Sequence, residues 1–393
     1  MSKDYLLQDA VQSFIKSKVG IPISEIALQK NPFPEIDWKL ILEQIESREK
    51  SKTKLPSWFS REKIIYPPKI SIEQTSSEET ARYKASLVQG DTLIDLTGGF
   101  GVDCYYFAQK IKSVFHCEQN LDLSEIVASN FKNLGINNVK FYKGNSNDFI
   151  HNIKEKTDWI YIDPSRRNSS KGKVFLLQDC EPNVPEMLET YFEISSNILL
   201  KTAPLLDISA GLKEIQNCKE IHIVALNNEV KELLWVLEKN FTGHPLLKTI
   251  NLNNKKEEVF EFYLNQNRTE PIYSEPLKYL YEPNAAIMKS GGFKELALAF
   301  NLYKLHPNSH LYTSNELVPF CGRVFEINHF FDYQKNNMKT FLQNTKANIT
   351  TRNFPETVEN LKKKWKINDG GTDYCFFTTY GNELKIVLLC KKI

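Results

Sequence analysis

Residues 92–103 read Thr92-Leu-Ile-Asp-Leu-Thr-Gly-Gly-Phe-Gly-Val-Asp103, an apolar strand followed by three glycines and the start of a helix. Glycines in this position allow positive φ and let the backbone approach a ligand closely. At the carboxyl end of a parallel strand, such a turn meets the N-terminus of the next helix, where nucleotides bind in open α/β sheets. A tight turn without a ligand can have the same glycines, so both interpretations stay open at this point.

Short apolar runs alternate with helical segments from about residue 71 to 268. We expect strands at 92–97, 113–117, 139–142, 159–162, 197–201 and 221–226, and helices at 104–111, 124–134 and 184–195. This alternation implies right-handed crossovers and a doubly wound, mostly parallel, Rossmann-like sheet of the α/β class. The pattern at 259–264 predicts one more strand, at the edge of the sheet and with antiparallel pairing allowed.

The regions on either side differ from this central part. Residues 1–70 have helical periodicity interrupted by prolines, which predicts a helical N-terminal region. After Pro276, strand-like and helical pieces mix, which predicts small α+β units, and Gly381-Asn382 predicts the turn of a final hairpin. We expect domain boundaries near residues 70, 270 and 320.

Composition excludes several classes of protein. The 393 residues include 50 Lys and Arg against 48 Asp and Glu, so no global basic field indicates nucleic acid. No apolar run approaches the length of about 18 residues that a membrane span needs, and the N-terminus lacks the apolar core of a secretion signal. Seven scattered cysteines without a C-x-x-C pair indicate reduced thiols and a cytoplasmic protein, and the dispersed histidines predict no metal site.

Polar side chains follow the expected strands at the edge where the glycines lie. Glu118 ends the second strand, where a carboxylate accepts hydrogen bonds from ribose hydroxyls. Asp95 precedes the glycines and suits a cofactor with ammonium and sulfonium groups better than a pyrophosphate. The spacing is also not the G-x-G-x-x-G of a dinucleotide site. Residues 145–148 are placed to flank an adenine, although Ser146 or Asn147 could simply cap a helix.

In this order the motifs resemble those of class I S-adenosylmethionine-dependent methyltransferases. Residues 73–84 together with Asp163-Pro-Ser-Arg-Arg167 look more specifically like bacterial methyltransferases with a C-terminal THUMP-like domain. The resemblance implies a methyltransferase domain at 71–270, a ferredoxin-like α+β unit at 271–320 and a THUMP-like domain at 321–393. It also implies S-adenosylmethionine as cofactor and structured RNA, tRNA or rRNA, as substrate, without a membrane or an obligate protein partner.

The resemblance also assigns roles to residues. The expected cofactor-binding residues are Asp95, Thr97, Gly98, Gly99, Gly101, Asp103, Glu118, Asn145, Ser146 and Asp148. Asp163 and the Pro164 carbonyl would be the catalytic groups that orient an acceptor nitrogen. Enzymes that methylate exocyclic base amines commonly continue this strand end with a second proline and an aromatic residue, whereas Ser165 and two arginines follow here. Upstream residues Gln74, Thr75, Arg82 and Tyr83 would close over the cofactor, unless they only pack within the helices.

The tail has a local excess of basic residues between 335 and 366, interleaved with aromatic residues. Such a surface can follow a phosphate backbone while aromatic rings stack on bases. A solvated lysine-rich helix with buried aromatics is the simpler alternative. The residues that we expect to bind RNA are Arg166, Arg167, Arg352, Lys362, Lys363 and Lys366.

Other functions remain open besides methylation of an RNA base. One is methylation of a protein or a small molecule, with the tail as a docking module. Another is an RNA-binding protein that has kept the cofactor crevice but lost the chemistry. A dehydrogenase is the remaining class, and the glycine spacing disfavours it.

Overall fold

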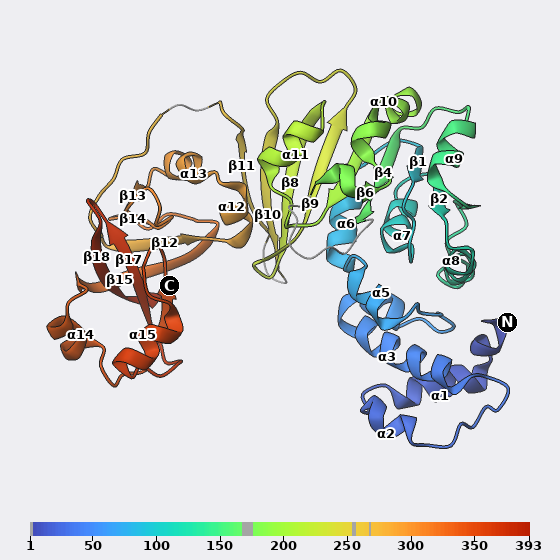
Figure 1. Cartoon of the computed structure of the whole chain (residues 1–393), viewed down its shortest axis with the longest axis horizontal. Coiled ribbons are helices and arrows are strands. Elements are labelled where there is room, and N and C mark those ends of the chain that lie inside the picture. Colours follow the sequence, from blue (N-terminus) through green and yellow to red (C-terminus); the bar gives the residue numbers. More distant parts are fainter. Residues whose placement is uncertain (1–2, 167–175, 254–256, 267–268) are drawn as a thin grey trace. The chain divides into compact units, whose positions relative to one another are not determined.

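The computed structural model describes residues 3–166, 176–253, 257–266 and 269–393, and it has the expected α/β architecture with additional helical and α+β regions (Figure 1). Backbone contacts divide the chain into two compact units. The first comprises Met1–Lys219 and Leu233–Gly243, and the second comprises Glu220–Glu232 and His244–Ile393. Within the described ranges, no helix combines the length and the apolar character that are needed to cross a bilayer.

A helical region opens the first unit, as predicted. Its helices are η1 (Lys3–Leu7), α1 (Asp9–Lys18), α2 (Ile23–Ala27), α3 (Trp38–Lys54), α4 (Pro56–Phe59), α5 (Lys69–Gln74) and α6 (Glu78–Leu87). Helix α3 begins after Asp37, whose carboxylate accepts a hydrogen bond from the Lys39 N–H, and it buries Ile41 and Ile45 one turn apart. Buried Trp58 of α4 packs its ring 5.0 Å from that of Phe100, so the helical region touches the glycine loop.

The sheet of the first unit has the strand order β9-β7-β4-β1-β2-β3. Its strands are β1 (Thr92–Asp95), β2 (Ser113–Glu118), β3 (Val139–Lys143), β4 (Trp159–Ile162), β7 (Asn197–Thr202) and β9 (Glu229–Glu238), which enters this unit at Leu233. Neighbouring strands run parallel except for β9, which is antiparallel to β7. The parallel strands therefore all end at the same edge of the sheet, and the polar residues after them are brought together there.

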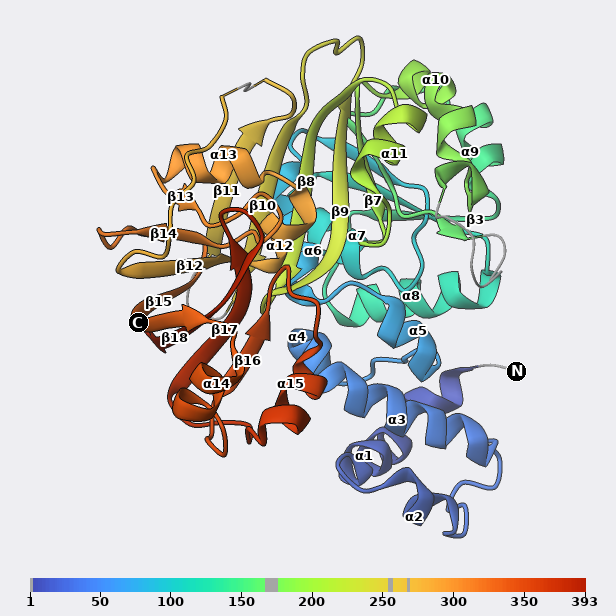
Figure 2. The ribbon, with the colours of Figure 1, turned by 60° about the vertical axis from the view of Figure 1, so that its left-hand side comes forward.

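Helices cross over between these strands. They are α7 (Val102–Ala108), α8 (Leu121–Asn133), α9 (Ser146–Asn152), α10 (Val184–Ile194) and α11 (Ile208–Glu214). The chain steps outward from β1 to β3 and then returns to β4, so right-handed crossovers put α7 and α8 on one face and α9 and α10 on the other, as Figure 2 shows. Between β4 and α10, β5 (Ser165–Arg166) pairs with β6 (Cys180–Glu181), next to η2 (Leu177–Asp179).

The second unit begins with three more strands, β8 (Cys218–Leu226, in this unit from Glu220), β10 (Leu246–Leu252) and β11 (Glu257–Tyr263). Strand β10 runs parallel to β8, and β11 is antiparallel to β10, which confirms the expected antiparallel edge strand. A polar cluster ties these strands to the rest of the unit, because the Glu258 carboxylate accepts hydrogen bonds from Asn251 and Asn284.

The remainder of the second unit is α+β, as predicted. Its elements are β12 (Tyr279–Pro283), α12 (Ala285–Ser290), α13 (Phe293–Ala299), β13 (Tyr303–Lys304), β14 (Tyr312–Ser314), β15 (Gly322–Asp332), α14 (Lys335–Phe341), β16 (Asn348–Thr351), α15 (Val358–Trp365), β17 (Asp373–Tyr380) and β18 (Leu384–Lys392). The strands form one sheet in the order β13-β14-β12-β15-β18-β17-β16. The predicted final hairpin is confirmed, because Tyr380 pairs with Leu384 across a turn in which Gly381 has a φ of 52°.

Candidate active site

Each glycine in the loop after β1 is required by its backbone conformation, by a close contact, or by both. Gly99 and Gly101 have φ values of 53° and 78°, a region that favours glycine. A Cβ on Gly98 would lie 2.4 Å from Nε2 of His116, and one on Gly101 would lie 2.7 Å from Cγ1 of Val127. Side chains at positions 98 and 101 would clash with β2 and α8. The loop can therefore lie this close to both elements only with glycine at these positions.

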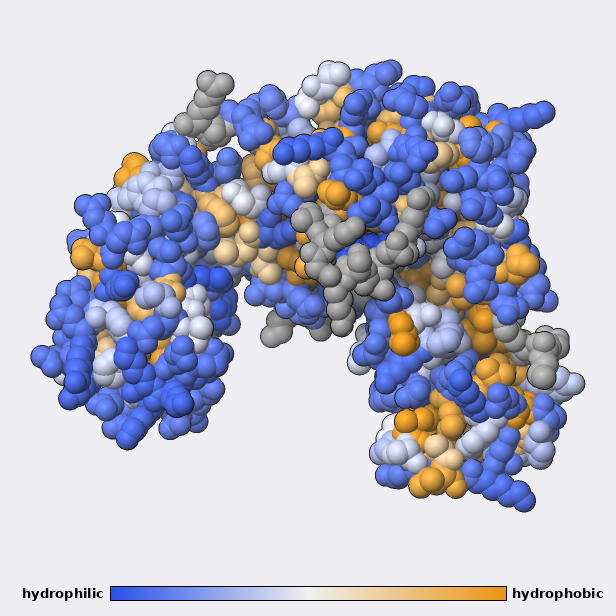
Figure 3. Space-filling view, viewed as in Figure 1, coloured by the Kyte–Doolittle hydropathy of each residue, from blue (hydrophilic) through white to orange (hydrophobic). Residues whose placement is uncertain are grey.

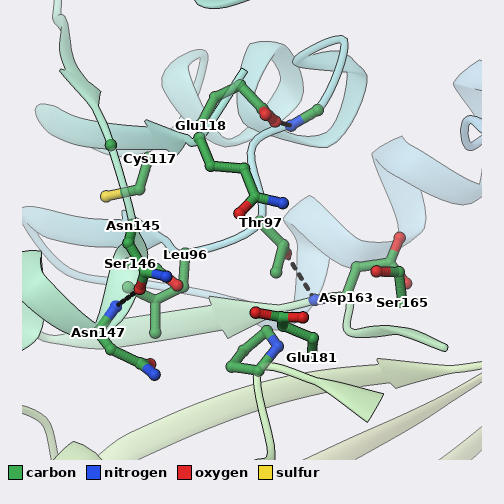
Figure 4. Close-up of a pocket in the computed structure, with 14 residues that line it drawn as sticks. Leu96, Thr97, Cys117, Glu118, Asn145, Ser146, Asn147, Asp163, Ser165 and Glu181 are labelled. Carbon is green, nitrogen blue, oxygen red and sulfur yellow. Dashed lines mark hydrogen bonds between the residues drawn. The ribbon is translucent and has the colours of Figure 1, made fainter. Parts of the chain in front are cut away.

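Glu118, at the end of β2, holds this loop in place. Its Oε2 accepts a hydrogen bond from the Gly99 N–H at 2.9 Å (Figure 4), and its Oε1 accepts one from the Asn120 N–H at 2.7 Å. Each carboxylate oxygen can accept more than one hydrogen bond. The arrangement thus orients the carboxylate toward the loop and leaves acceptor capacity for a ligand.

A pocket of about 210 Å³ lies across the carboxyl ends of β1 to β4. The predicted site residues that line it are Thr97, Gly99, Glu118, Asn145, Ser146 and Asp163. Asn147, in the predicted adenine-flanking stretch 145–148, lines it too, whereas sequence reasoning did not identify the lining residues Leu96, Cys117, Gln119, Glu181 and Pro182. Glu181 belongs to β6, and Pro182 follows it. Strand β6 pairs with β5 from an earlier part of the sequence, and no local motif predicts this pairing.

A second pocket, of about 270 Å³, shares Thr97, Gly99, Asp163 and Ser165 with the first. The remaining predicted residues of the glycine region line this one, namely Asp95, Gly98, Gly101 and Asp103. Gln74 and Thr75, at the end of α5, form part of its wall, as do Ser71 and Ser76. The α5–α6 segment thus closes the glycine loop from the side opposite to β2.

Three predicted residues, Arg82, Tyr83 and Asp148, lie outside both pockets. The Arg82 guanidinium binds Glu78 at 3.2 Å and lies over the Tyr106 ring, and neither Arg82 nor Tyr83 lines the two pockets. Asp148 is in the first turn of α9, also outside both pocket walls. The residue that caps α9 is Asn145, whose Oδ1 accepts the Asn147 N–H at 2.8 Å, so capping by Ser146 or Asn147 was the wrong expectation.

The Asp103 carboxylate is bound by side chains of the protein itself. Its carboxylate accepts hydrogen bonds from Ser76 at 2.9 Å and from the Tyr161 hydroxyl at 2.7 Å, and Lys84 lies 3.2 Å away. Burial raises the pKa of Asp103, but the positive charges of Lys84 and Lys201 and the hydrogen bonds outweigh it, so the pKa is lowered overall. Asp103 is therefore an ionised group that joins α6, α7 and β4.

Asp95 is 1% exposed and accepts a hydrogen bond from the Thr97 N–H at 3.0 Å. Burial raises its pKa well above the ordinary value, and the negative charges of Asp103, Asp163 and Glu118 raise it further. Four acidic residues thus surround the glycine loop. A positively charged ligand beside Asp95 would lower the pKa of that carboxyl again, because a cation favours its ionised form.

Asp163, directly after β4, lies where the two pockets meet. Its backbone N–H donates to the Thr97 hydroxyl at 2.7 Å (Figure 4), and its Oδ2 is 2.6 Å from the Lys201 ammonium of β7. Pro164 follows it. Lys201 was not among the predicted site residues, although a charged residue near the end of an apolar strand beside β4 was a visible signal.

The expected RNA-binding residues fall into different settings. Arg166 is exposed on β5, whereas Arg167 lies outside the described residues. The Arg352 guanidinium is 2.9 Å from Oε1 of Glu282, which is only 2% exposed, so Arg352 is engaged in an internal ion pair. Lys362 pairs with Asp369 at 2.5 Å.

Lys363 and Lys366 are exposed at the end of α15, while Leu361 and Trp365 of the same helix are buried. Hydrophilic residues cover most of the visible face of the region from β15 to β18 (Figure 3). Lys363 and Lys366 are thus exposed members of the predicted basic surface, as are Lys335, Lys339 and Lys346.

Comparisons with known proteins give two family matches and one full-length relative. A model of a ferredoxin-like domain matches residues 279–320, and a model described as THUMP domain-like matches 322–392. The solved structure of a proposed methyltransferase from Porphyromonas gingivalis W83 is 30% identical, with 100% of this chain and 99% of that chain covered and a TM-score of 0.90. No curated protein matches the chain.

Other solved structures resemble only part of the chain. An rRNA methylase from Streptococcus thermophilus is 16% identical over 41% of this chain and 95% of its own, with a TM-score of 0.30. A proposed methyltransferase from Streptococcus mutans, in complex with SAH, is 12% identical over 41% of this chain and 96% of its own, also with a TM-score of 0.30. Likenesses at this level carry no argument about ligand or substrate.

Proposed function

The chain belongs to a family of bacterial class I methyltransferases that carry a ferredoxin-like and a THUMP-like domain at the carboxyl end, and from this membership we propose that it methylates structured RNA with S-adenosylmethionine. The observation that carries the proposal is the pair of joined pockets at the carboxyl ends of β1 to β4, with Asp163 at their junction. Ligands of doubly wound sheets bind at this edge.

The residues of the pockets fit S-adenosylmethionine. Glu118 has oxygens available for the ribose hydroxyls, and Asn145 and Ser146 supply polar groups for an adenine edge. Glu118 and Asp163 place carboxyl groups at the pockets, which suits a sulfonium and an ammonium group, whereas the raised pKa of Asp95 favours its neutral form until a cation lies beside it. Bound there, the cofactor would supply an electrophilic methyl group. The chain's own contribution would be alignment of the acceptor by Asp163 and the Pro164 carbonyl.

The substrate part of the proposal is tRNA or rRNA, with a base as the expected methylated group. The THUMP-like match and the exposed Lys363 and Lys366 of α15 support an RNA substrate. RNA of this kind is found in the cytoplasm, where we propose that the protein works. Methylation of a protein or a small molecule is the competing function, and labelled methyl transfer distinguishes it.

The proposal predicts cofactor binding that depends on Glu118. Calorimetric titration of the full chain with S-adenosylhomocysteine should give saturable binding. Glu118→Ala should weaken it about ten-fold or more, because the ribose loses its acceptor and Gly99 loses its anchor. Glu238→Ala, which removes a carboxylate from an ion pair with Lys219 in the same unit, is the control and should bind as the wild type does.

Labelled S-adenosylmethionine and total small RNA then test the substrate. Label in RNA supports the proposal, and label in protein alone would favour the competing function. If the wild type binds neither cofactor form, even with RNA present, an RNA-binding protein without methyltransferase chemistry becomes the better description.

A further inference from the structure

Asp163, at the junction of the two pockets, is bound by a lysine that itself lines neither of them. The register of β4 and β7, in which Ile162 lies beside Leu200, brings Lys201 next to Asp163. The Lys201 Nζ is 2.6 Å from Asp163 Oδ2, with the lysine side chain 13% exposed and the aspartate side chain 36% exposed. Because Asp163 lines both pockets, the group that would meet the methyl acceptor is itself bound to a cation.

Lys201 is one member of an alternating row of charges. Lys84 is fully buried and 3.2 Å from Asp103, and the charge of Lys201 acts on Asp103 as well as on Asp163. The row therefore reads positive, negative, positive, negative from Lys84 to Asp163. Removal of Lys201 would leave Asp163 without this cation and Asp103 with Lys84 alone, and breaking such a pair is costly. These two carboxylates therefore hold the Lys201 ammonium in place.

We propose that Lys201 determines which kind of acceptor atom is methylated: one that gives up a proton and reacts as an anion, and not a neutral exocyclic amine. In RNA this chemistry belongs to the ring imide N–H of a guanine or uracil base and to the ribose 2′-hydroxyl. The inference rests on the proposed function and specifies the substrate of the same site.

Electrostatics gives the reason. An exocyclic amine becomes positively charged as it takes up a methyl group, and a neighbouring ammonium group opposes that change. An anionic oxygen or ring nitrogen is instead stabilised by the fixed ammonium, and preorganised charges of this kind give some of the largest effects in catalysis.

The transfer balances with the groups at hand. The acceptor's proton passes to the Asp163 carboxylate, and the electron pair that it leaves forms the bond to the methyl carbon while the carbon–sulfur bond breaks with its pair on sulfur. Asp163 ends neutral and releases the proton to solvent, and Lys201 keeps its charge throughout. Lys201 is thus a positioning residue, whose effect reaches the acceptor through charge and through Asp163.

The test uses the full chain, unmodified tRNA and rRNA transcripts and labelled S-adenosylmethionine, with the labelled RNA digested to nucleosides and identified by mass spectrometry. We expect a ring-methylated guanosine or uridine, or a 2′-O-methylnucleoside, which resistance of the neighbouring linkage to alkali identifies. Lys201→Met should lower kcat about 100-fold, the usual effect of removing one preorganised group, and should leave the Kd for S-adenosylhomocysteine within about three-fold. Lys201→Arg should restore part of kcat, because it keeps the charge.

Lys219→Met is the matched control, since it removes a lysine from an ion pair with Glu238 in the same unit, and it should behave as the wild type. A methyl group on an exocyclic amine would overturn the inference, and so would full activity of Lys201→Met. If both Lys201 variants lose cofactor binding and thermal stability to the same extent, the lysine has only a structural role, and this result would also overturn the inference. If the wild type binds S-adenosylhomocysteine but labels no RNA, the proposed function itself fails, which is a distinguishable result.

Discussion

His116 is completely buried in β2, directly beneath the glycine loop. Its ring lies where a Cβ of Gly98 would be and contacts the ring of Phe141 at a centroid distance of 5.4 Å. Burial lowers the pKa of His116 from 6.5 to about 4. The imidazole is therefore neutral in the folded protein at neutral pH, and it supports the loop by its shape.

This setting predicts loss of stability in mild acid. Between pH 6.5 and about 4 the unfolded chain protonates His116 while the folded chain does not, so stability that is complete above pH 6.5 decreases as the pH falls. The difference should reach about 3 kcal/mol at most, at 1.36 kcal/mol for each pKa unit. His116→Phe should show a smaller fall in the midpoint of thermal unfolding from pH 7 to pH 5 than the wild type. The control His151→Phe, at an exposed position, should keep the wild-type slope, and equal slopes for all three proteins would contradict the assignment.

Single residues also show what a sequence reveals about a site. Glu118 could be located from the sequence, because a carboxylate at a strand end is a local signal. Its hydrogen bond to Gly99 joins residues 19 positions apart and could not be foreseen. Lys201 was missed for a related reason, since its importance comes from Asp163 on a neighbouring strand, 38 positions away. Residue types at strand ends are readable, whereas pairing between strands depends on tertiary register.

At the scale of elements, the strands flanked by clear turns were predicted, whereas β9 and β10 were among those that were missed. Strand β9 carries Glu229, Lys231 and Glu232 at its start, which obscures the apolar run that follows. The turn before it was nevertheless a usable signal, because two asparagines between apolar runs favour a two-residue hairpin turn. Strand β10 mixes polar and apolar residues, so its sequence has no clear strand pattern. Its pairing with β8 and β11 makes it a strand, and sequence alone does not reveal that pairing.

The turn between β8 and β9 carries a prediction of its own. Asn227 and Asn228 both have positive φ, 51° and 65°, which is the conformation of a type I′ turn. The Asn228 N–H also donates to Asn251, and its Oδ1 accepts the Ala285 N–H at 2.7 Å. Asn228→Ala should therefore destabilise the second unit by about 1–3 kcal/mol through backbone strain and loss of the Oδ1 hydrogen bond to Ala285.

Chemical denaturation would measure this change, with Asn227→Gly as the comparison. Glycine tolerates positive φ, so that variant should unfold at the wild-type denaturant concentration or slightly above it. Equal destabilisation by both substitutions would show that the asparagine side chains, and not the left-handed backbone, determine the stability of this turn.

At the scale of the whole molecule, the chemistry and the exposed basic residues belong to different units. The joined pockets are formed by residues of the first unit, whereas Lys363 and Lys366 lie in the second. The pockets and these two lysines thus belong to separate units of a nearly neutral chain. Such a division predicts that the two tasks can be changed independently.

The double variant Lys363→Gln, Lys366→Gln should weaken binding of an unmodified tRNA transcript while leaving the Kd for S-adenosylhomocysteine unchanged. Each lost phosphate contact should reduce the steepness of log K against log salt by about 0.7–0.9, so filter binding at several salt concentrations measures the effect. KM for RNA should rise with little change in kcat, because these contacts are equal in the ground and transition states. Lys294→Gln, which removes a lysine paired with Glu270 in the same unit, is the control for a general loss of charge. An unchanged salt dependence of the double variant would assign RNA binding to another surface, since exposed lysines that touch phosphates must contribute to that slope.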